Sequence, residues 1–461
     1  MSYPAFDRLI GEIVEYPGNI LIHGCPGTGK STMIKRLIEY LEDDGLYITA
    51  STGIASLNIE HEHATTVHRF LGCQLFQGSV NGLVNQIKKK SGLLKKLRSV
   101  SHLIIDEAMM LDLGTFVRAN EVISIIRGDM DDIDLPPCTN VTGSSIFGGI
   151  RLILVGDVCQ LAPIQAYREE IDGEWYTYRY LFQHPIWKKL NLKIINLTIP
   201  KRYDVVLGED SNGIDFLGAI DDTRMGNLTS RVRALMKYCS RPPQTHNGVK
   251  PTMFVSTNKE VDIINARQLA KLEGDVVKYE AQFFRDSGST LSKDDMIKDA
   301  RITDPFEFKI GAQVMLLINM HEHRLCNGSR GVVERISGNL PVVKFMNGVS
   351  LLITPYTWTR KSKVPGDRED TWKVHRASLT ALPLKLCWAM TIHKSQGQTV
   401  DTAIISLKQC FAPGHFLVAI SRVRNYEHMY IRDWSESAFD KSKVDKCVIE
   451  FCATLPNSEL E

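Results

Sequence analysis

Residues 24–31, GCPGTGKS, constrain the fold more than any other part of the chain, because they match the pattern G-x-x-x-x-G-K-[ST]. An apolar segment at 20–23 precedes them and a helical pattern at about 30–42 follows. In this context backbone N–H groups wrap phosphate oxygens, and the helix N-terminus adds a favourable dipole. We expect Lys30 to contact the β- and γ-phosphates and Ser31 to bind Mg²⁺. The other nucleotide-binding candidates of this loop are Gly27, Thr28, Gly29 and Thr32.

Apolar segments that alternate with helical segments predict two parallel α/β sheets in tandem. The first set of segments lies at 19–24, 46–51, 102–108, 151–157 and 192–197. The second set lies at 252–257, 386–392, 402–407 and 428–433. Between 308 and 357, short strands and Asn-Gly turns predict a small antiparallel barrel inserted in the second α/β domain. Polar segments at 128–148 and 359–376 are expected to be loops.

The composition is that of an ordinary globular protein, with 43 % apolar and 23 % charged residues in a chain of 461. A chain of this length is expected to form about two to four domains. The net charge of +2 provides no overall field that would attract a polyanion. One basic cluster is read either as a solvated helix face or as a nucleic-acid contact; it comprises Lys88, Lys89, Lys90, Lys95, Lys96 and Arg98.

The ten cysteines form no pair of Cys-x-x-Cys motifs at zinc-site spacing, so we expect structural thiols. With no signal peptide and no disulfide-like framework, an intracellular, reducing setting is expected. No apolar segment reaches the ~18 residues of a membrane span, so no membrane partner is expected.

Two further segments supply polar side chains at the ends of apolar strands. Asp106 and Glu107 follow the apolar residues of LIIDEAMML, where Asp106 would hold Mg²⁺ and Glu107 would orient and deprotonate an attacking water. Adjacent carboxylates at a strand end are costly unless a cation shares them, which favours this reading over a surface Asp-Glu pair. Gln160, in LILVGDVCQLAPI, is a candidate sensor of the γ-phosphate.

In order and spacing, these motifs resemble the superfamily 1 helicases of the 5′-to-3′ branch, and most closely the Pif type. The segments that carry the resemblance include GCPGTGKST, ITASTGIASLNI, TTVHRFLG, LIIDEAMML, LTIPKRY, TNKEVDIINARQLAKL, FKIGAQVMLLIN, WAMTIHKSQGQTVD and LVAISRVRN. They cover nearly the whole chain. The resemblance implies an α/β protein with two tandem RecA-like P-loop motor domains and ATP bound at their interface.

The resemblance also implies domain boundaries. The first motor domain would span 1–197, with a wedge-like insertion at about 70–100 in which Phe76 is a candidate duplex-separating pin. The second would span 198–461, with a Src-homology-3-like β-barrel inserted at about 300–380. No N-terminal extension or accessory domain is visible, so the sequence reads as close to a bare motor.

Residue roles follow from the same resemblance. Arg202 of KRY and Arg422 of ISR would be arginine fingers that offset charge at the γ-phosphate. Gln398 would turn toward the nucleotide. The candidates for contact with the single-stranded DNA backbone are Thr52, Thr66, His68, His393, Lys394 and Ser395. His68 is also read as a satisfied core histidine.

The sequence departs from the family pattern in several places. No Gln precedes Gly24, so the base preference of the nucleotide is open. Tyr203 follows Arg202 where the family often has Gln, and VCQLAPI is less aromatic than the family version, which weakens the case for a DNA-stacking contact there. The Asp- and Pro-rich segment 128–144 looks like an insertion.

The sequence therefore predicts an ATP- and Mg²⁺-dependent DNA helicase that moves 5′ to 3′ on single-stranded DNA, in replication, recombination or repair. Its partners would be single-stranded DNA, forked or tailed duplex, and replication or single-strand-binding proteins, and it would act as a monomer. The alternatives are a single-stranded DNA translocase that strips proteins with little unwinding, an RNA-acting helicase, and a nucleotide-gated clamp without useful turnover.

Overall fold

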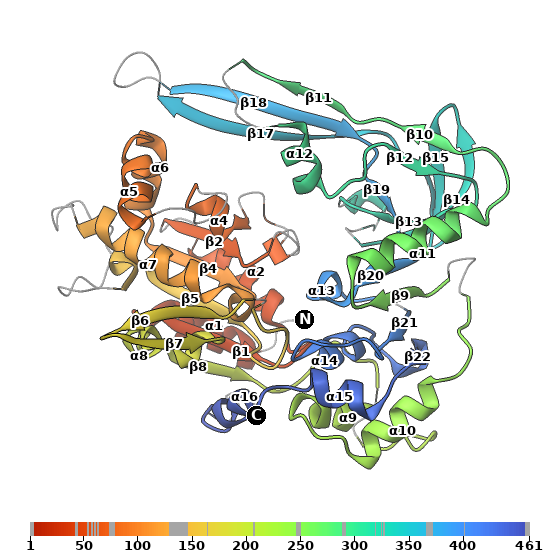
Figure 1. Cartoon of the computed structure of the whole chain (residues 1–461), viewed down its shortest axis with the longest axis horizontal. Coiled ribbons are helices and arrows are strands. Elements are labelled where there is room, and N and C mark those ends of the chain that lie inside the picture. The colour runs from red at the N-terminus through yellow and green to blue at the C-terminus, as the bar shows by residue number, and fades with distance from the viewer. Residues whose placement is uncertain are drawn as a thin grey trace.

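The computed structural model contains two parallel sheets covered by helices, together with antiparallel sheets that lie beside the second (Figure 1). It describes residues 4–456 except 42–44, 53–54, 57–58, 60, 62–63, 73–78, 129–145, 164, 206–207, 246–249, 288–291, 319, 324, 326–327, 366–371 and 401. Phe76 and nearly all of the segment 128–144 lie outside the described residues. Within them, no helix is long and apolar enough to cross a membrane.

The first unit is built on a six-stranded parallel sheet. In spatial order its strands are β3 (Thr65–Thr66), β2 (Leu46–Ala50), β4 (His102–Asp106), β5 (Arg151–Gly156), β1 (Ile20–Gly24) and β8 (Lys193–Leu197). The helices are α1 (Pro4–Glu15), α2 (Lys30–Leu41), α4 (Val67–Phe70), α5 (Val80–Lys88), α6 (Ser91–Ser99), α7 (Leu113–Gly128) and α8 (Ile186–Leu190).

Both faces of this sheet are buried, which explains its continuous apolar strands. Ile20 and Ile22 of β1 pack with α1 and α2 on one face. Leu21, between them in sequence, points to the opposite face and joins the core formed with α5, α6 and α7. The alternation follows from the two-residue repeat of a strand. The five expected strands of the first set are therefore confirmed.

The second unit is built on a four-stranded parallel sheet. In spatial order its strands are β20 (Ala389–Thr391), β9 (Thr252–Val255), β21 (Ala403–Ser406) and β22 (Met429–Asp433). Its helices are α9 (Phe216–Arg224), α10 (Ser230–Cys239), α11 (Asn258–Ala270), α13 (Ile392–Ser395), α14 (His415–Ile420), α15 (Glu436–Ser442) and α16 (Lys446–Cys452). The expected strand at 386–392 is wrong in extent, because β19 (Leu384–Leu386) pairs with the antiparallel sheet and only β20 joins the parallel one.

The antiparallel strands lie between β9 and β20 in sequence. One sheet contains β16 (Ser350–Leu352), β15 (Leu340–Phe345), β14 (Arg330–Ser337), β13 (Gln313–Leu316) and β19. A second sheet has the order β11 (Gln282–Arg285), β18 (Trp372–Ala381) and β17 (Tyr356–Pro365), and α12 (Lys293–Ala300) lies beneath it in Figure 1. A third pairs β10 (Val277–Tyr279) with β12 (Phe306–Phe308).

The expectation of a loop at 359–376 is wrong, because most of this segment forms the long hairpin of β17 and β18. Its charged residues favoured a loop reading, but its Thr, Val and Trp residues favour extended backbone. Buried Arg330 anchors the antiparallel sheet on the parallel one, since its Nη1 donates to Thr252 Oγ1 at 3.0 Å and to the Thr402 carbonyl at 2.9 Å.

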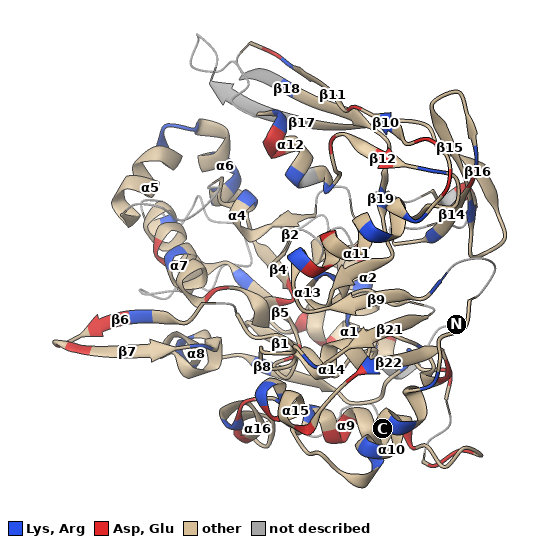
Figure 2. Cartoon of the chain, turned by 45° about the vertical axis from the view of Figure 1, so that its right-hand side comes forward, with Lys and Arg blue, Asp and Glu red and all other residues tan. Residues whose placement is uncertain are grey.

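The first unit also carries a hairpin that the sequence patterns did not indicate. Strands β6 (Tyr167–Ile171) and β7 (Glu174–Tyr178) extend away from the body of the molecule and carry both signs of charge (Figure 2). Trp175 on β7 is 69 % exposed.

A buried arginine joins α7 to the end of α6. Arg127 of α7 donates through Nη1 to the carbonyls of Leu97, Arg98 and Val100 at 2.8 to 3.1 Å, and through Nε to the carbonyl of Gly148. Burial lowers the pKa of Arg127 to about 10, so the side chain remains charged at neutral pH. Four carbonyls at the end of α6 and beside α7 therefore depend on one guanidinium.

Replacement of Arg127 by Leu should lower the free energy of unfolding by about 3 kcal/mol, because it leaves buried carbonyls without donors. Chemical denaturation measures the change. Arg8→Leu is the matched control, since Arg8 is 72 % exposed and its ion pair with Glu12 is long at 3.9 Å. The control should change stability by less than about 0.5 kcal/mol. Equal effects of the two substitutions would contradict the assigned role of Arg127.

Candidate functional site

The loop between β1 and α2 has the geometry of a phosphate cradle. Gly27 and Gly29 have φ angles of +83° and +97°, which favour glycine. A Cβ at Gly29 would meet no described atom within 4 Å, so the loop opens into free space there. Lys30 Nζ donates to the carbonyls of Gly24 at 2.6 Å and Cys25 at 3.0 Å. The Thr28 hydroxyl donates to the Cys25 carbonyl at 3.0 Å, while Ser31 and Thr32 are exposed in the first turn of α2.

The acidic pair lies at the end of β4. The buried Asp106 carboxylate accepts a hydrogen bond from the Glu107 backbone N–H at 2.8 Å, and Glu107 has a left-handed φ of +50°. Burial, followed by the Glu107 charge, raises the pKa of Asp106 to about 7, although Lys30 opposes the shift. A nearby cation would offset this cost, and a carboxylate with the Ser31 hydroxyl provides the hard oxygen donors that Mg²⁺ prefers.

These side chains do not form a complete metal site by themselves. Among the described residues, no group of three or more His, Cys, Asp or Glu side chains could hold a metal ion. Mg²⁺ commonly binds through one or two protein ligands together with substrate phosphates and water. The donor set therefore fits Mg²⁺ that arrives with a nucleotide.

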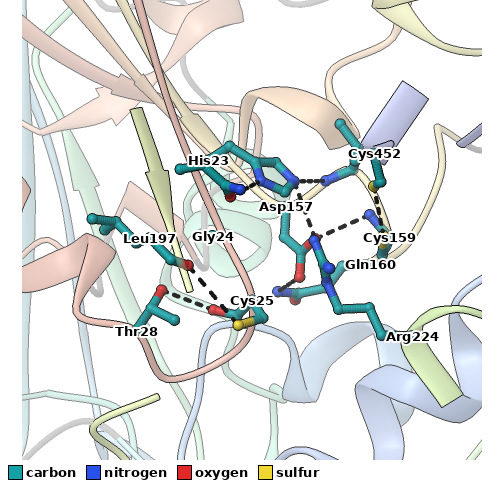
Figure 3. A network of polar contacts seen from close by, with 12 residues as sticks. His23, Gly24, Cys25, Thr28, Asp157, Cys159, Gln160, Leu197, Arg224 and Cys452 are labelled. Atoms are coloured by element: carbon teal, nitrogen blue, oxygen red, sulfur yellow. Dashed lines mark hydrogen bonds and ion pairs between the residues drawn. The ribbon is translucent and has the colours of Figure 1, made fainter. Parts of the chain in front are cut away.

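A buried network follows β5 (Figure 3). Gln160 Nε2 donates to Asp157 Oδ2 at 3.2 Å, Arg224 Nη2 lies 3.5 Å from Asp157 Oδ1, and His23 Nε2 lies 3.6 Å from the same oxygen. Burial alone would raise the pKa of Asp157, but Arg224 and then His23 hold it well below its usual range. Gln160 Oε1 is buried and accepts no hydrogen bond from the described residues. Gln160 thus carries a buried acceptor atom in this network that a ligand could use.

The two predicted arginine fingers lie close together. A Cβ at Gly27 would come within 2.5 Å of Arg202 Cβ, so Arg202 lies against the phosphate loop. Arg202 Nη1 donates to the Ser421 carbonyl at 3.1 Å, and Arg422 Nη2 donates to the Ser421 hydroxyl at 2.8 Å. Burial, followed by the charge of Arg202, lowers the pKa of Arg422 to about 10, so Arg422 remains charged at neutral pH, and burial also lowers the pKa of Arg202.

Gln396 is a functional candidate that sequence reasoning missed. Its Nε2 donates to Glu107 Oε2 at 3.1 Å, and this bond joins the second unit to the acidic pair of the first. Gln398, the residue predicted to face the nucleotide, is half-buried, and its backbone N–H donates to the Ser395 carbonyl at 3.0 Å. Two glutamines stand in HKSQGQT, and only the turn after α13 decides which one reaches Glu107.

The remaining residues of this segment divide into exposed and buried ones. Lys394 is exposed, whereas Ser395 is fully buried and its hydroxyl donates to the Ile392 carbonyl at 2.7 Å. The predicted contact between Ser395 and DNA therefore does not match this structure, since the hydroxyl points into the core. His393 Nδ1 lies 3.1 Å from Nε2 of buried His415.

The candidate DNA contacts of the first unit have local structural roles. Thr52 Oγ1 accepts from the Ala55 N–H at 3.2 Å, and Thr66 caps α4 by accepting from the Arg69 N–H at 3.3 Å. His68 Nε2 lies 3.3 Å from Thr115 Oγ1, and burial lowers the pKa of His68. All three are half-buried, so each retains access to solvent.

The basic cluster is not uniformly solvated. Lys96 Nζ donates to the Phe70 carbonyl at 2.6 Å and lies 4.6 Å from the centre of the Phe70 ring. Burial lowers the pKa of Lys96 to about 8. Lys96 is therefore a structural residue, while four members are exposed: Lys88, Lys89, Lys90 and Lys95.

Two family models match the chain. The PIF1-like helicase model matches residues 4–233, and the model of the 2B domain of the DNA helicase Pif1 matches residues 304–336. The second match falls within the antiparallel sheets and includes β12, β13 and most of β14.

Curated relatives are similar over most of the chain. The ATP-dependent DNA helicase PIF1 of Xenopus laevis is 34 % identical over 423 residues, which are 90 % of this chain and 59 % of the relative. The Homo sapiens protein of the same name is 31 % identical over 441 residues, which are 95 % of this chain and 61 % of the relative. The chain thus spans about three fifths of the length of these relatives.

Solved structures share the fold. The Pif1 helicase of Candida albicans has a TM-score of 0.75 at 27 % identity, with 99 % of this chain and 100 % of that chain covered. Bacteroides sp. Pif1 in complex with ADP-AlF4 has a TM-score of 0.72 at 23 % identity, with 98 % and 96 % covered. The two RecA-like α/β domains are therefore confirmed, while the Src-homology-3-like barrel stays a prediction.

The buried His415 predicts a pH dependence of stability. Burial, followed by His393, lowers the pKa of His415 to about 3 from an ordinary value near 6.5. Below pH ~6.5 the unfolded chain binds a proton at this histidine, whereas the folded protein keeps it neutral. The contribution of His415 to the free energy of unfolding is therefore fully present above pH ~6.5 and falls by up to about 1.4 kcal/mol per pH unit as the pH decreases toward 3. His415→Asn, which keeps an acceptor for nearby backbone N–H groups, should weaken the pH dependence of the thermal midpoint between about pH 7 and 5.

His61→Asn, at a half-buried histidine of the first unit, is the matched control for that measurement. The control should retain the pH dependence of the wild type. If His415→Asn retained it as well, the buried neutral imidazole would not be its source.

Proposed function

The chain belongs to the PIF1-like helicase family, and we propose that it is an ATP-dependent DNA helicase that moves 5′ to 3′ on single-stranded DNA and separates duplex. One observation carries the proposal: the phosphate loop, the acidic pair and two arginines lie close together, and Gln396 joins Glu107 to the segment that holds Lys394. The names of the relatives, ATP-dependent DNA helicases, support the same activity.

The first step is nucleotide binding. Lys30 would exchange the carbonyls of Gly24 and Cys25 for phosphate oxygens, which are stronger partners for an ammonium group. Ser31 and Asp106 would hold Mg²⁺, which supplies positive charge that neutralises the phosphates. Cation binding also keeps Asp106 ionised against the effect of its burial.

Glu107 would then orient and deprotonate the attacking water. Arg202 and Arg422 offset the charge that develops on the transferred phosphoryl group. Arg202 already contacts the loop at Gly27, whereas Arg422 is bonded to the Val418 carbonyl at 2.8 Å and to Ser421. Arg422 therefore has to release these partners before it reaches a phosphate, and closure of the cleft would drive that change.

DNA would lie across both units. Thr52, Thr66 and His68 of the first and His393 and Lys394 of the second are suited to the sugar–phosphate backbone, because hydroxyls, imidazoles and an ammonium contact phosphate without reading bases. The Glu107–Gln396 bond ends two residues from Lys394, so a shift of the DNA contact changes the hydrogen bonding of the catalytic carboxylate.

We extend the proposal to the setting of this activity. The protein would act as a monomer on forked or tailed duplex, with replication or single-strand-binding proteins, in replication, recombination or repair. The seven described cysteines are free thiols, which supports an intracellular, reducing environment.

A strand-displacement assay tests the function. Duplex with a 5′ single-stranded tail should be separated in the presence of ATP and Mg²⁺, and duplex with a 3′ tail should not. Lys30→Ala should abolish hydrolysis yet retain DNA binding, and Glu107→Gln should lower kcat by about a hundredfold or more while it retains bound ATP. Separation of duplexes with 3′ tails alone would contradict the proposed polarity. ATP hydrolysis without strand separation would identify a translocase. Wild-type turnover by Glu107→Gln would show that Glu107 is not the catalytic base.

The Glu107–Gln396 bond predicts a separable defect. Gln396→Ala should reduce the stimulation of ATP hydrolysis by single-stranded DNA by about tenfold and leave the basal rate within about twofold, because it breaks the link between DNA and catalytic carboxylate. Gln398→Ala is the comparison, and it should instead raise the KM for ATP. If only Gln398→Ala lost the stimulation by DNA, the coupling would belong to Gln398, and its assignment to Gln396 would be wrong.

A further inference from the structure

Two cysteines that lie far apart in the sequence meet in the polar network that follows β5. The sulfur atoms of Cys159 and Cys452 lie 3.3 Å apart, although the residues are separated by 293 positions in the sequence (Figure 3). Cys159 belongs to the first unit, between Asp157 and Gln160, and Cys452 is the last residue of α16 in the second unit. Both are free thiols.

Packing of α16 on the first unit holds the pair in register. Phe451 stacks on Phe182 with ring centroids 4.4 Å apart, and the Tyr180 hydroxyl donates to Asp445 Oδ2 at 2.7 Å. The sulfurs need to approach by about 1.2 Å to reach the ~2.05 Å of a disulfide. Contacts at the N-cap and in the last turn of α16 therefore hold this helix, and with it Cys452, against the first unit.

The surroundings of the pair divide the thiols into two chemical types. Cys159 is fully buried, and its bond to Cys452, together with burial, raises its pKa. Cys452 is half-buried, and its hydrogen bond with Cys159, together with the nearby Arg224 guanidinium, lowers its pKa although burial opposes the shift. Cys452 is thus the accessible thiol with more thiolate character, which is the type that oxidants attack. Cys25 differs, because burial raises its pKa.

We propose that Cys159 and Cys452 are an oxidant-sensitive pair whose disulfide locks α16 onto the loop that carries Asp157 and Gln160. Hydrogen peroxide would oxidise the Cys452 thiolate to sulfenic acid, with one oxygen transferred and water released after protonation. The Cys159 thiol then attacks the sulfenic sulfur, the S–O bond breaks, and a second water leaves. In sum, two thiols and one peroxide yield one disulfide and two waters.

The lock would act on the motor because the bond joins the two units at the cleft. Asp157 and Gln160, which flank Cys159, would be tied to the C-terminal helix through one covalent link. Movement of the second unit relative to the first during a nucleotide cycle would then stop. This consequence rests on the proposed function, whereas formation of the disulfide does not.

The experiment treats fully reduced protein with hydrogen peroxide and maps disulfides by peptide mass spectrometry without reduction. A cross-linked peptide that contains Cys159 and Cys452 is expected. DNA-stimulated ATP hydrolysis should fall by about tenfold and return after dithiothreitol. Absence of this peptide, or a cross-link that leaves hydrolysis unchanged, would overturn the inference.

Two variants separate the pair from the other thiols. Cys452→Ser should hydrolyse ATP normally and resist peroxide, whereas Cys447→Ser, on the same helix, should stay as sensitive as the wild type. If peroxide inactivated Cys452→Ser as much as the wild type, the oxidised site would lie elsewhere, and the proposed role of the pair would be wrong. A protein that forms the cross-link but hydrolyses no ATP before treatment would support the thiol pair and refute the proposed function.

Discussion

The buried ion pair between Asp157 and Arg224 is the interaction on which the cleft depends. Asp157 of the first unit lies within electrostatic reach of Lys30, and a buried carboxylate is costly unless a cation and hydrogen bonds accompany it. Arg224, at the end of α9, brings that charge from the second unit. The same carboxylate accepts a hydrogen bond from Gln160, so it determines both the inter-unit contact and the position of the predicted phosphate sensor.

Around this pair, two catalytic candidates, Glu107 and Arg202, contact groups from both units. Glu107 accepts from Gln396, and Arg202 touches the phosphate loop while it donates to Ser421. These bonds are few and polar, and in the proposed function a nucleotide phosphate would offer the Arg202 guanidinium a stronger, charged partner than the Ser421 carbonyl. A cleft built in this way can exchange one set of hydrogen bonds for another at modest cost, which is what a cyclic motor needs.

The sequence allowed the fold to be predicted where local rules decide the outcome. The phosphate loop and the first parallel sheet follow from motif context and strand periodicity. The expectation of a loop where β17 and β18 form a hairpin was wrong, because the many charged residues of this segment outweighed its Thr, Val and Trp residues, which favour strands. The roles of Gln396 and Ser395 and the contact of Cys159 with Cys452 depend on how a turn directs side chains and on tertiary packing, which no sequence pattern encodes.

The most direct test of the account is the initial rate of ATP hydrolysis at saturating ATP, measured without nucleic acid, with single-stranded DNA, and with single-stranded RNA of the same sequence. If the cleft couples DNA to catalysis, DNA should raise the rate by about tenfold or more, and RNA should raise it less. A rate that single-stranded DNA leaves unchanged would contradict the central claim.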